Sequence, residues 1–66
     1  MNVELCWHTI DMEPGKIRRA GNFTVKEATA YFNDMQDIAS VKYAYLRRFD
    51  GWQWHHYKWL KKKEKS

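Results

Sequence analysis

The segment that begins at Thr24 constrains the fold most, because it carries the clearest helical signal in the chain. Thr24 and Glu27 form a capping box, in which the hydroxyl accepts from the backbone of residue 27 and the carboxylate reaches back to the cap. Phe23, just before the cap, is expected to pack on Ala28. The apolar residues that follow at spacings of three and four are Val25, Ala28, Phe32, Met35 and Ala39. This stripe predicts one amphipathic helix that packs on a sheet.

The residues before this helix predict two strands joined by a tight turn. Residues 2–10 alternate apolar side chains with polar or small ones, which is the period of a half-buried strand. The apolar set is Val3, Leu5 and Trp7. Pro14 and Gly15 suit the two central positions of a type II turn. A weaker strand is expected over residues 16–22, ended by Gly21 and Asn22.

Residues 41–60 are rich in β-branched and aromatic residues, and Asp50-Gly51 divides them into two runs. This dipeptide favours a two-residue type I′ hairpin, which would pair Phe49 with Trp52 and Val41 with Leu60. Such a register predicts two faces for the hairpin. The first face would hold Val41, Tyr43, Tyr45, Arg47, Phe49, Trp52, Trp54, His56, Lys58 and Leu60. The second would hold Lys42, Ala44, Leu46, Arg48, Gln53, His55, Tyr57 and Trp59.

Together these elements predict an α+β two-layer domain of order β-β-α-β-β, or β-α-β-β if the second strand does not form. A single helix covers only one face of an antiparallel sheet. We expect it to cover the first face of the hairpin, because that face has more large apolar side chains. The side chains expected to remain exposed on the second face are Lys42, Arg48, His55, Tyr57 and Trp59.

The aromatic content suggests what the exposed surface is for. A chain of 66 residues has room for one small domain, which we place at residues 1–60. Aromatic residues make up 17% of the chain, too many for a disordered polypeptide. Because a domain of this size buries only about 60% of the surface that its unfolded chain exposes, many rings must lie at or near the surface. Exposed rings are therefore the main functional clue.

The basic charge of the chain is concentrated near its C-terminus. The formal net charge is +4 at pH 7, yet residues 1–57 hold seven Lys and Arg against seven Asp and Glu. The excess lies in Lys58, Lys61, Lys62, Lys63 and Lys65, offset by Glu64. We expect residues 61–66 to form a frayed, solvated tail, with contact to nucleic acid or another anionic partner as the alternative.

Several function classes have no support in the sequence. The single cysteine, Cys6, allows no intramolecular disulfide, and adjacent His55 and His56 on a strand point to opposite faces, so no metal site is indicated. The chain has no Gly-rich phosphate loop, nucleophile elbow or paired-carboxylate motif, so we expect no enzymatic activity and no cofactor. With no signal peptide and no apolar stretch of about 18 residues, a cytoplasmic location without a membrane contact is expected.

The exposed second face predicts binding to a larger macromolecule. Aromatic residues and Arg are frequent at interface hot spots, so this face suits a protein partner. The predicted function is that of a small regulator or inhibitor, of the kind common among phages and mobile elements. Rings beside cations also suit base stacking and phosphate contacts. The candidate residues for this nucleic-acid alternative are Arg47, Arg48, Lys58, Lys61, Lys62 and Lys63. Pairing of two copies through a strand edge is a third alternative.

The segment Phe23-Thr24-Val25-Lys26-Glu27-Ala28 resembles the opening of the first helix in small winged-helix excisionases. The resemblance implies a DNA-binding fold in which Ser40 caps a second helix that continues through Arg48. Residues 52–59 would then form the wing. The alternation of residues 41–45 favours a strand at this place instead.

Overall fold

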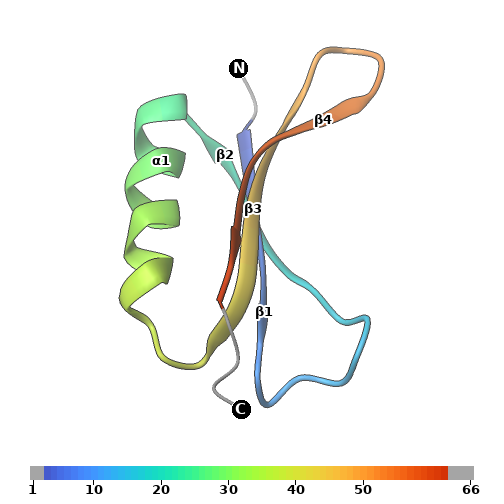
Figure 1. Ribbon diagram of the computed structural model, residues 1–66. Helices are drawn as coiled ribbons and strands as arrows, with labels where there is room; N and C mark the ends of the chain where they lie inside the picture. Colours follow the sequence, from blue (N-terminus) through green and yellow to red (C-terminus); the bar gives the residue numbers. More distant parts are fainter. Residues whose placement is uncertain (1–2, 63–66) are drawn as a thin grey trace.

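The computed structural model describes residues 3–62 and has two layers, one helix and one sheet (Figure 1). The elements in chain order are β1 (Val3–Thr9), β2 (Arg18–Phe23), α1 (Val25–Asp34), the short 3-10 helix η1 (Met35–Asp37), β3 (Val41–Phe49) and β4 (Trp54–Lys61). The helix packs on one face of a four-stranded antiparallel sheet. The predicted α+β class and the order β-β-α-β-β are therefore confirmed.

The sheet has the strand order β2-β1-β3-β4, and every neighbouring pair is antiparallel. β1 thus lies between the two strands that α1 connects, and β2 and β4 form the edges. The pairing of β1 with β3 sorts side chains onto two faces. Leu5 and Leu46 pair on the side of the helix, whereas Cys6 and Tyr45 pair on the other side, which we call the open face.

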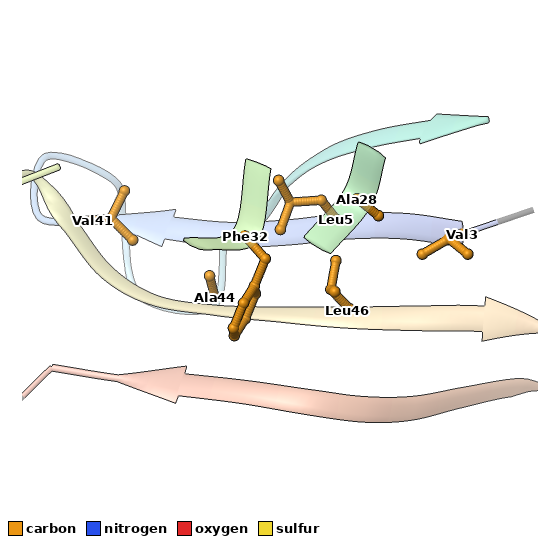
Figure 2. Packing of buried hydrophobic residues seen from close by; sticks show 7 residues of the cluster. All are labelled: Val3, Leu5, Ala28, Phe32, Val41, Ala44 and Leu46. Carbon is orange, nitrogen blue, oxygen red and sulfur yellow. The ribbon is translucent and has the colours of Figure 1, made fainter. Parts of the chain in front are cut away.

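The hydrophobic core fills the space between α1 and the two central strands, as Figure 2 shows. Its buried members are Val3, Leu5, Ala28, Phe32, Val41, Ala44 and Leu46. Ala28 on the helix and Ala44 on the sheet have no exposed surface, and their small side chains allow the two layers to approach closely. Phe32 fills the remaining volume, so the interface reaches the close packing that a small domain needs.

Both halves of the predicted capping box are present at the start of α1. The backbone N–H of Glu27 donates to the Thr24 hydroxyl at 3.1 Å, and the N–H of Thr24 donates to the Glu27 carboxylate at 3.1 Å. Phe23 packs against the core, as a residue before the cap should, and its ring centroid lies 5.0 Å from that of Tyr31. Local chemistry therefore fixes where the helix begins.

The predicted apolar stripe of the helix is only partly correct. The α-helix ends at Asp34, so Met35 belongs to η1 and Ala39 lies beyond both, where it is exposed. Val25, in the first turn, is 45% exposed. The residues of α1 that are buried are Ala28 and Phe32. A stripe of two buried positions explains why the core is small.

The turn between β1 and β2 has the predicted geometry. The backbone N–H of Lys16 donates to the carbonyl three residues earlier at 3.1 Å, and Gly15 has a φ of 85°, as a type II turn requires. The strand that follows differs from the prediction, because it continues through Asn22 to Phe23. Asn22 adopts a φ of 65°, and the pairing with β1 is irregular nearby. Gly21 and Asn22, which were predicted to end the strand, thus lie at an irregular point within β2.

The hairpin between β3 and β4 does not have the predicted two-residue turn. Phe49 pairs with Trp54 and not with Trp52, so residues 50–53 form the loop. The Asp50 oxygen Oδ1 accepts from the backbone N–H groups of Trp52 and Gln53, at 2.7 and 2.8 Å. This bonding of a side chain to the nearby backbone stabilises a longer loop than the dipeptide alone predicts.

The prediction of which hairpin face lies under the helix is wrong for its large rings, although Val41 and Leu60 of that face do pack in the core. Ala44 faces the helix, whereas Tyr43 and Tyr45 lie on the open face. The pairing of β3 with β4 shifts at Tyr57, which reverses the alternation, so Trp59 pairs with Tyr45 on the open face as well. Large rings would hold a short helix away from the sheet. The layer interface therefore uses the smaller side chains.

The sheet extends further toward the C-terminus than expected. Lys61 is the last residue of β4, and the backbone N–H of Lys62 donates to the carbonyl of Lys42 at 3.1 Å. The predicted tail over residues 61–66 therefore begins inside the sheet. Its remainder, with the candidate Lys63, lies outside the described residues.

The winged-helix alternative requires a helix from Ser40 through Arg48. Val41–Phe49 instead form β3, which pairs with β1 on one side and β4 on the other. The second helix that the resemblance to excisionases implies is therefore wrong.

Candidate functional site

Alternate residues of β3 and β4 form a row of side chains on the open face. We call this row the aromatic strip, and its members are Tyr45, Arg47, Phe49, Trp54, His56 and Trp59. Four of its rings remain exposed, namely His56 together with Phe49 at 39%, Trp54 at 38% and Trp59 at 59%. Single exposed apolar residues are common on proteins, but a contiguous exposed patch of them marks a contact surface.

One end of the aromatic strip is a cluster of three rings. The ring centroid of Tyr45 lies 4.6 Å from that of His56 and 4.5 Å from that of Trp59, with tilted planes. His56 and Trp59 meet edge to face at 5.6 Å. Each such contact stabilises the arrangement by about 0.5–1.5 kcal/mol, so the rings are held in place before any partner binds.

The other end of the aromatic strip is a ring pair with a cation over it. The centroids of Phe49 and Trp54 lie 5.4 Å apart, and the guanidinium carbon of Arg47 lies 4.3 Å from the Trp54 ring centroid. This cation–π contact joins the two ends of the strip into one continuous surface, because Arg47 pairs with His56 of the three-ring cluster.

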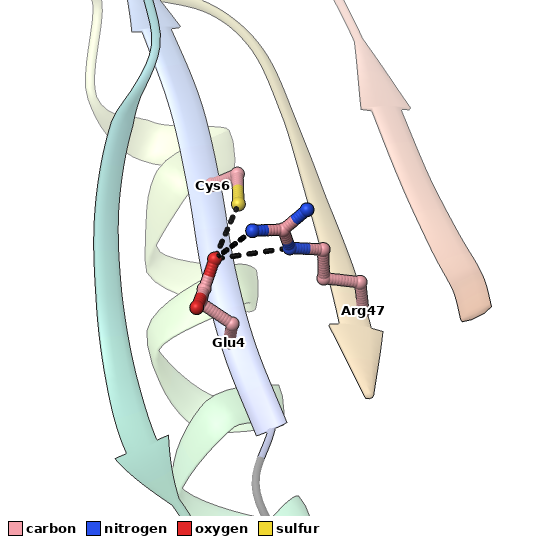
Figure 3. Close-up of polar contacts among 3 residues, drawn as sticks. All are labelled: Glu4, Cys6 and Arg47. Atoms are coloured by element: carbon pink, nitrogen blue, oxygen red, sulfur yellow. Dashed lines mark hydrogen bonds and ion pairs between the residues drawn. The ribbon is translucent and has the colours of Figure 1, made fainter. Parts of the chain in front are cut away.

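Arg47 forms an ion pair with Glu4 of β1 (Figure 3). Nε and Nη2 of Arg47 donate to Oε1 of Glu4 at 2.9 and 2.5 Å, and each side chain is only 18% exposed. The Cys6 thiol, which is fully buried, donates to the same oxygen at 3.5 Å. Burial raises the pKa of the Cys6 thiol, so it stays protonated at neutral pH. Cys6 therefore supports the strip as a packing residue and has none of the features of a nucleophile.

The loop before β4 displays Trp52, which is 87% exposed. Figure 1 shows this loop beyond the end of the sheet, curving away from the helix. The second carboxylate oxygen of Asp50 lies 2.6 Å from Nε2 of His55. Hydrogen bonds from the backbone of Gln53, from His55 and from the backbone of Trp52 hold the pKa of Asp50 at about 2, so its carboxylate is ionised at neutral pH. The Asp50 side chain thus holds the loop in place through these hydrogen bonds.

The five residues predicted to contact a partner do not form one surface. Trp59 lies in the aromatic strip. Arg48 and His55 pair with one another on the helix side, because Arg48 also pairs with a core residue of β1. Tyr57, 41% exposed, lies at the irregular point of β4, and Lys42 lies at the opposite end of β3. The partner-binding prediction thus included one member of the strip, the nucleic-acid alternative included Arg47, and the other four members were missed.

The residues predicted to contact nucleic acid are divided between the two faces as well. Lys58 lies on the helix side, with Nζ 5.9 Å from the Phe32 ring centroid, and Arg48 shares that side. Arg47 and Lys61 lie on the open face. Among the described members of this set, no continuous basic stripe forms along one face.

Residues 3–62 contain no group of three or more His, Cys, Asp or Glu side chains placed to hold a metal ion. They also contain no helix long and apolar enough to cross a membrane. Comparison of the chain with known protein families, with curated proteins and with solved structures finds no match.

Proposed function

We propose that this chain is a small protein-binding module that docks on a larger protein through its open face. It would act on that partner as a regulator or inhibitor, of the kind that phages and mobile elements encode. The observation that carries the proposal is the aromatic strip, whose rings are exposed yet already packed in place. Trp, Tyr and Arg dominate interface hot spots because they bury a large area with few rotatable bonds.

The display of Trp52 beside the strip supports the same function. A Trp side chain that is 87% exposed on a hydrogen-bonded loop contributes almost no burial energy to the fold. A partner with an apolar pocket would gain the full burial of that ring, at little cost in loop entropy. The expected partner surface has such pockets at its centre and polar groups around them.

The positions of the cations favour a protein over nucleic acid as the partner. Nucleic acid needs cations along the path of its phosphates, next to flat stacking platforms. Arg47, the cation at the centre of the strip, is already neutralised by Glu4 and covers the Trp54 ring. Lys58 lies on the other side of the sheet. The rings of the strip also tilt against one another, which suits pockets better than stacked bases.

Capture of a partner from host-cell lysate, with and without nuclease and across a salt gradient, tests the proposal. Recovery of one protein that survives nuclease and moderate salt is expected from the wild-type chain. Trp54→Ser and Trp59→Ser should abolish its capture, because they remove exposed rings of the strip. Ile10→Ser is the matched control, since Ile10 is 69% exposed but lies outside the strip. Equal capture by all three variants would overturn the proposal.

Recovery of nucleic acid in place of a protein would support the alternative. Its release should then follow salt steeply, because each neutralised phosphate frees counterions. Deletion of residues 63–66 would weaken that complex and would leave a protein complex intact, so the two outcomes are distinguishable.

Self-association through a strand edge is tested separately. The edges of the sheet are β2 and β4, and exposed edges can pair with a second copy. Light scattering that reports the mass of a monomer would exclude such a dimer. If light scattering reports the mass of a dimer and no partner is captured, pairing of two copies through a strand edge would be the favoured alternative.

A further inference from the structure

A pocket of about 750 Å³ lies at the end of the sheet opposite the Trp52 loop. It lies where the Pro14-Gly15 turn meets the start of β3 and the end of β4. Figure 1 shows the connection from β1 to β2 and the end of β4 at this same end of the molecule. The volume lies within the range of about 300–1,000 Å³ that is typical of small-molecule sites.

The lining of the pocket is strongly basic. Three of its residues are lysines, Lys42, Lys61 and Lys62, and no acidic residue within 3–62 lines it. They are close together because Lys61 pairs with Tyr43 across β3 and β4, and the backbone of Lys62 bonds to that of Lys42. The Lys62 ammonium also donates to the carbonyl of Ile38, which holds this side chain at the wall. A concave site lined by one sign of charge concentrates ligands of the opposite sign.

A rigid pair of rings forms another wall of the pocket. The rings of His8 and Tyr43 are stacked, with centroids 5.1 Å apart and planes within 15°. Nδ1 of His8 lies 2.7 Å from the carbonyl oxygen of Lys16. Because a carbonyl only accepts, Nδ1 carries a proton and donates it, which fixes the orientation of the imidazole. His8 is only 7% exposed, so it holds the half-buried Tyr43 ring in place, and Tyr43 offers the ordered ring surface in the pocket that the lysines line.

We propose that this pocket binds a mononucleotide, with its phosphate on the lysines and its base against the Tyr43 ring that His8 supports. Phosphate is held well by lysine ammonium groups, and a planar base packs on a planar aromatic ring. Lysines alone or aromatic rings alone would not indicate a nucleotide, but here both line the same cavity. The site is separate from the aromatic strip, so it does not depend on the proposed docking function.

Nuclear magnetic resonance titration of the full 66-residue chain with AMP tests this site. Saturable shifts should be confined to His8, Tyr43, Lys61 and their neighbours. Adenosine and inorganic phosphate, titrated separately, should each bind about tenfold more weakly than AMP, because each supplies only one of the two contacts. Equal binding of AMP and phosphate would remove the base from the proposal and overturn it.

Matched variants separate a built site from a general attraction to charge. Lys61→Gln should weaken AMP binding about tenfold, as the loss of one charge-assisted contact predicts. Lys26→Gln removes the same charge from the exposed surface of α1 and should change nothing. Equal weakening by both variants, or no saturable shift with the wild-type chain, would overturn the proposal.

A third pair of variants checks the place of the base. Tyr43→Leu should weaken AMP binding and leave phosphate binding unchanged, provided that its spectrum retains native dispersion. Trp54→Ser should leave AMP binding unchanged, because Trp54 lies at the far end of the open face. Loss of AMP binding in Trp54→Ser alone would place the ligand on the aromatic strip, which would contradict the pocket.

Discussion

The two faces of the sheet carry different side chains, and each contributes differently to the molecule. Under the helix, Ala44 and Leu46 pack closely on Phe32, and all three are nearly or fully buried. On the open face, Tyr45 and Trp59 pack mainly on neighbouring rings, and Trp59 remains 59% exposed. Most of the folding free energy therefore comes from the helix side, while much of the aromatic area of the open face stays available for binding.

The largest effect should come from removing the aromatic ring at the centre of the core. Phe32→Ala should cost about 3–5 kcal/mol, which approaches the whole stability of about 5 kcal/mol expected for so small a domain. Thermal unfolding followed by circular dichroism should show a strongly lowered melting temperature, with at most about 2 kcal/mol of stability left at 25 °C. Trp52→Ala removes a larger ring that is 87% exposed and should cost less than about 0.5 kcal/mol. Equal melting temperatures for the two variants would contradict the contrast between the faces.

The ion pair beneath the aromatic strip should have the next largest effect. Glu4→Gln leaves the half-buried Arg47 without its carboxylate and should cost about 1–3 kcal/mol. Urea unfolding measures this loss directly. Glu13→Gln changes the same charge at an exposed position and should stay within about 0.5 kcal/mol of the wild type. A similar loss in both variants would assign the effect to net charge.

The capping box should contribute about 1 kcal/mol to the helix side. Thr24→Ala removes the acceptor for the Glu27 N–H and should lower the free energy of unfolding by that amount. Thr29→Ala is the control, because the Thr29 hydroxyl bonds to the Val25 carbonyl within the helix, where Ala has the higher helix propensity. The control should be neutral or slightly stabilising, so a loss equal to that of Thr24→Ala would contradict a specific role for the cap.

The smallest effect should be a local pH dependence at the loop of the open face. Asp50 has a folded pKa of about 2 against its ordinary 3.8, so the fold favours the ionised carboxylate. Its contribution is present above the ordinary pKa and is lost as pH falls from 3.8 toward about 2. The amide signals of Trp52 and Gln53 should report this step. Asp50→Asn should remove it, and a step that persists in the variant would assign it to another group.

Much of the fold follows from local chemistry in the sequence. The Thr24 capping box and the Pro14-Gly15 turn each act within a few residues, and each is present in the structure. In β1 the predicted apolar set packs toward the helix, but Cys6 and His8 of the other face are buried as well, so the strand is not half-buried. The hairpin loop was mispredicted for a local reason as well. The Asp50 side chain bonds to the backbone of its own loop, and this competes with the two-residue turn that Asp-Gly favours.

The aromatic strip could not be predicted, because it depends on a pairing between distant strands. Which hairpin face turns inward is decided where Leu5 of β1 meets Leu46 of β3. These two residues lie far apart in the sequence, so their pairing is not a local property. The irregularity at Tyr57 then reverses which residues of β4 face the helix. The useful signal was the clean alternation of β1, whose apolar set identifies the helix side once its neighbour is known.

We propose that the open face binds a partner while the helix side stabilises the fold. The most direct test measures both quantities on Trp54→Ser and Trp59→Ser, namely the free energy of unfolding and the affinity for the captured protein. Each variant should lose about 1–2 kcal/mol of stability, remain folded and bind at least about 30-fold more weakly. Unchanged affinity in a folded variant would contradict the claim, as would unfolding of both variants.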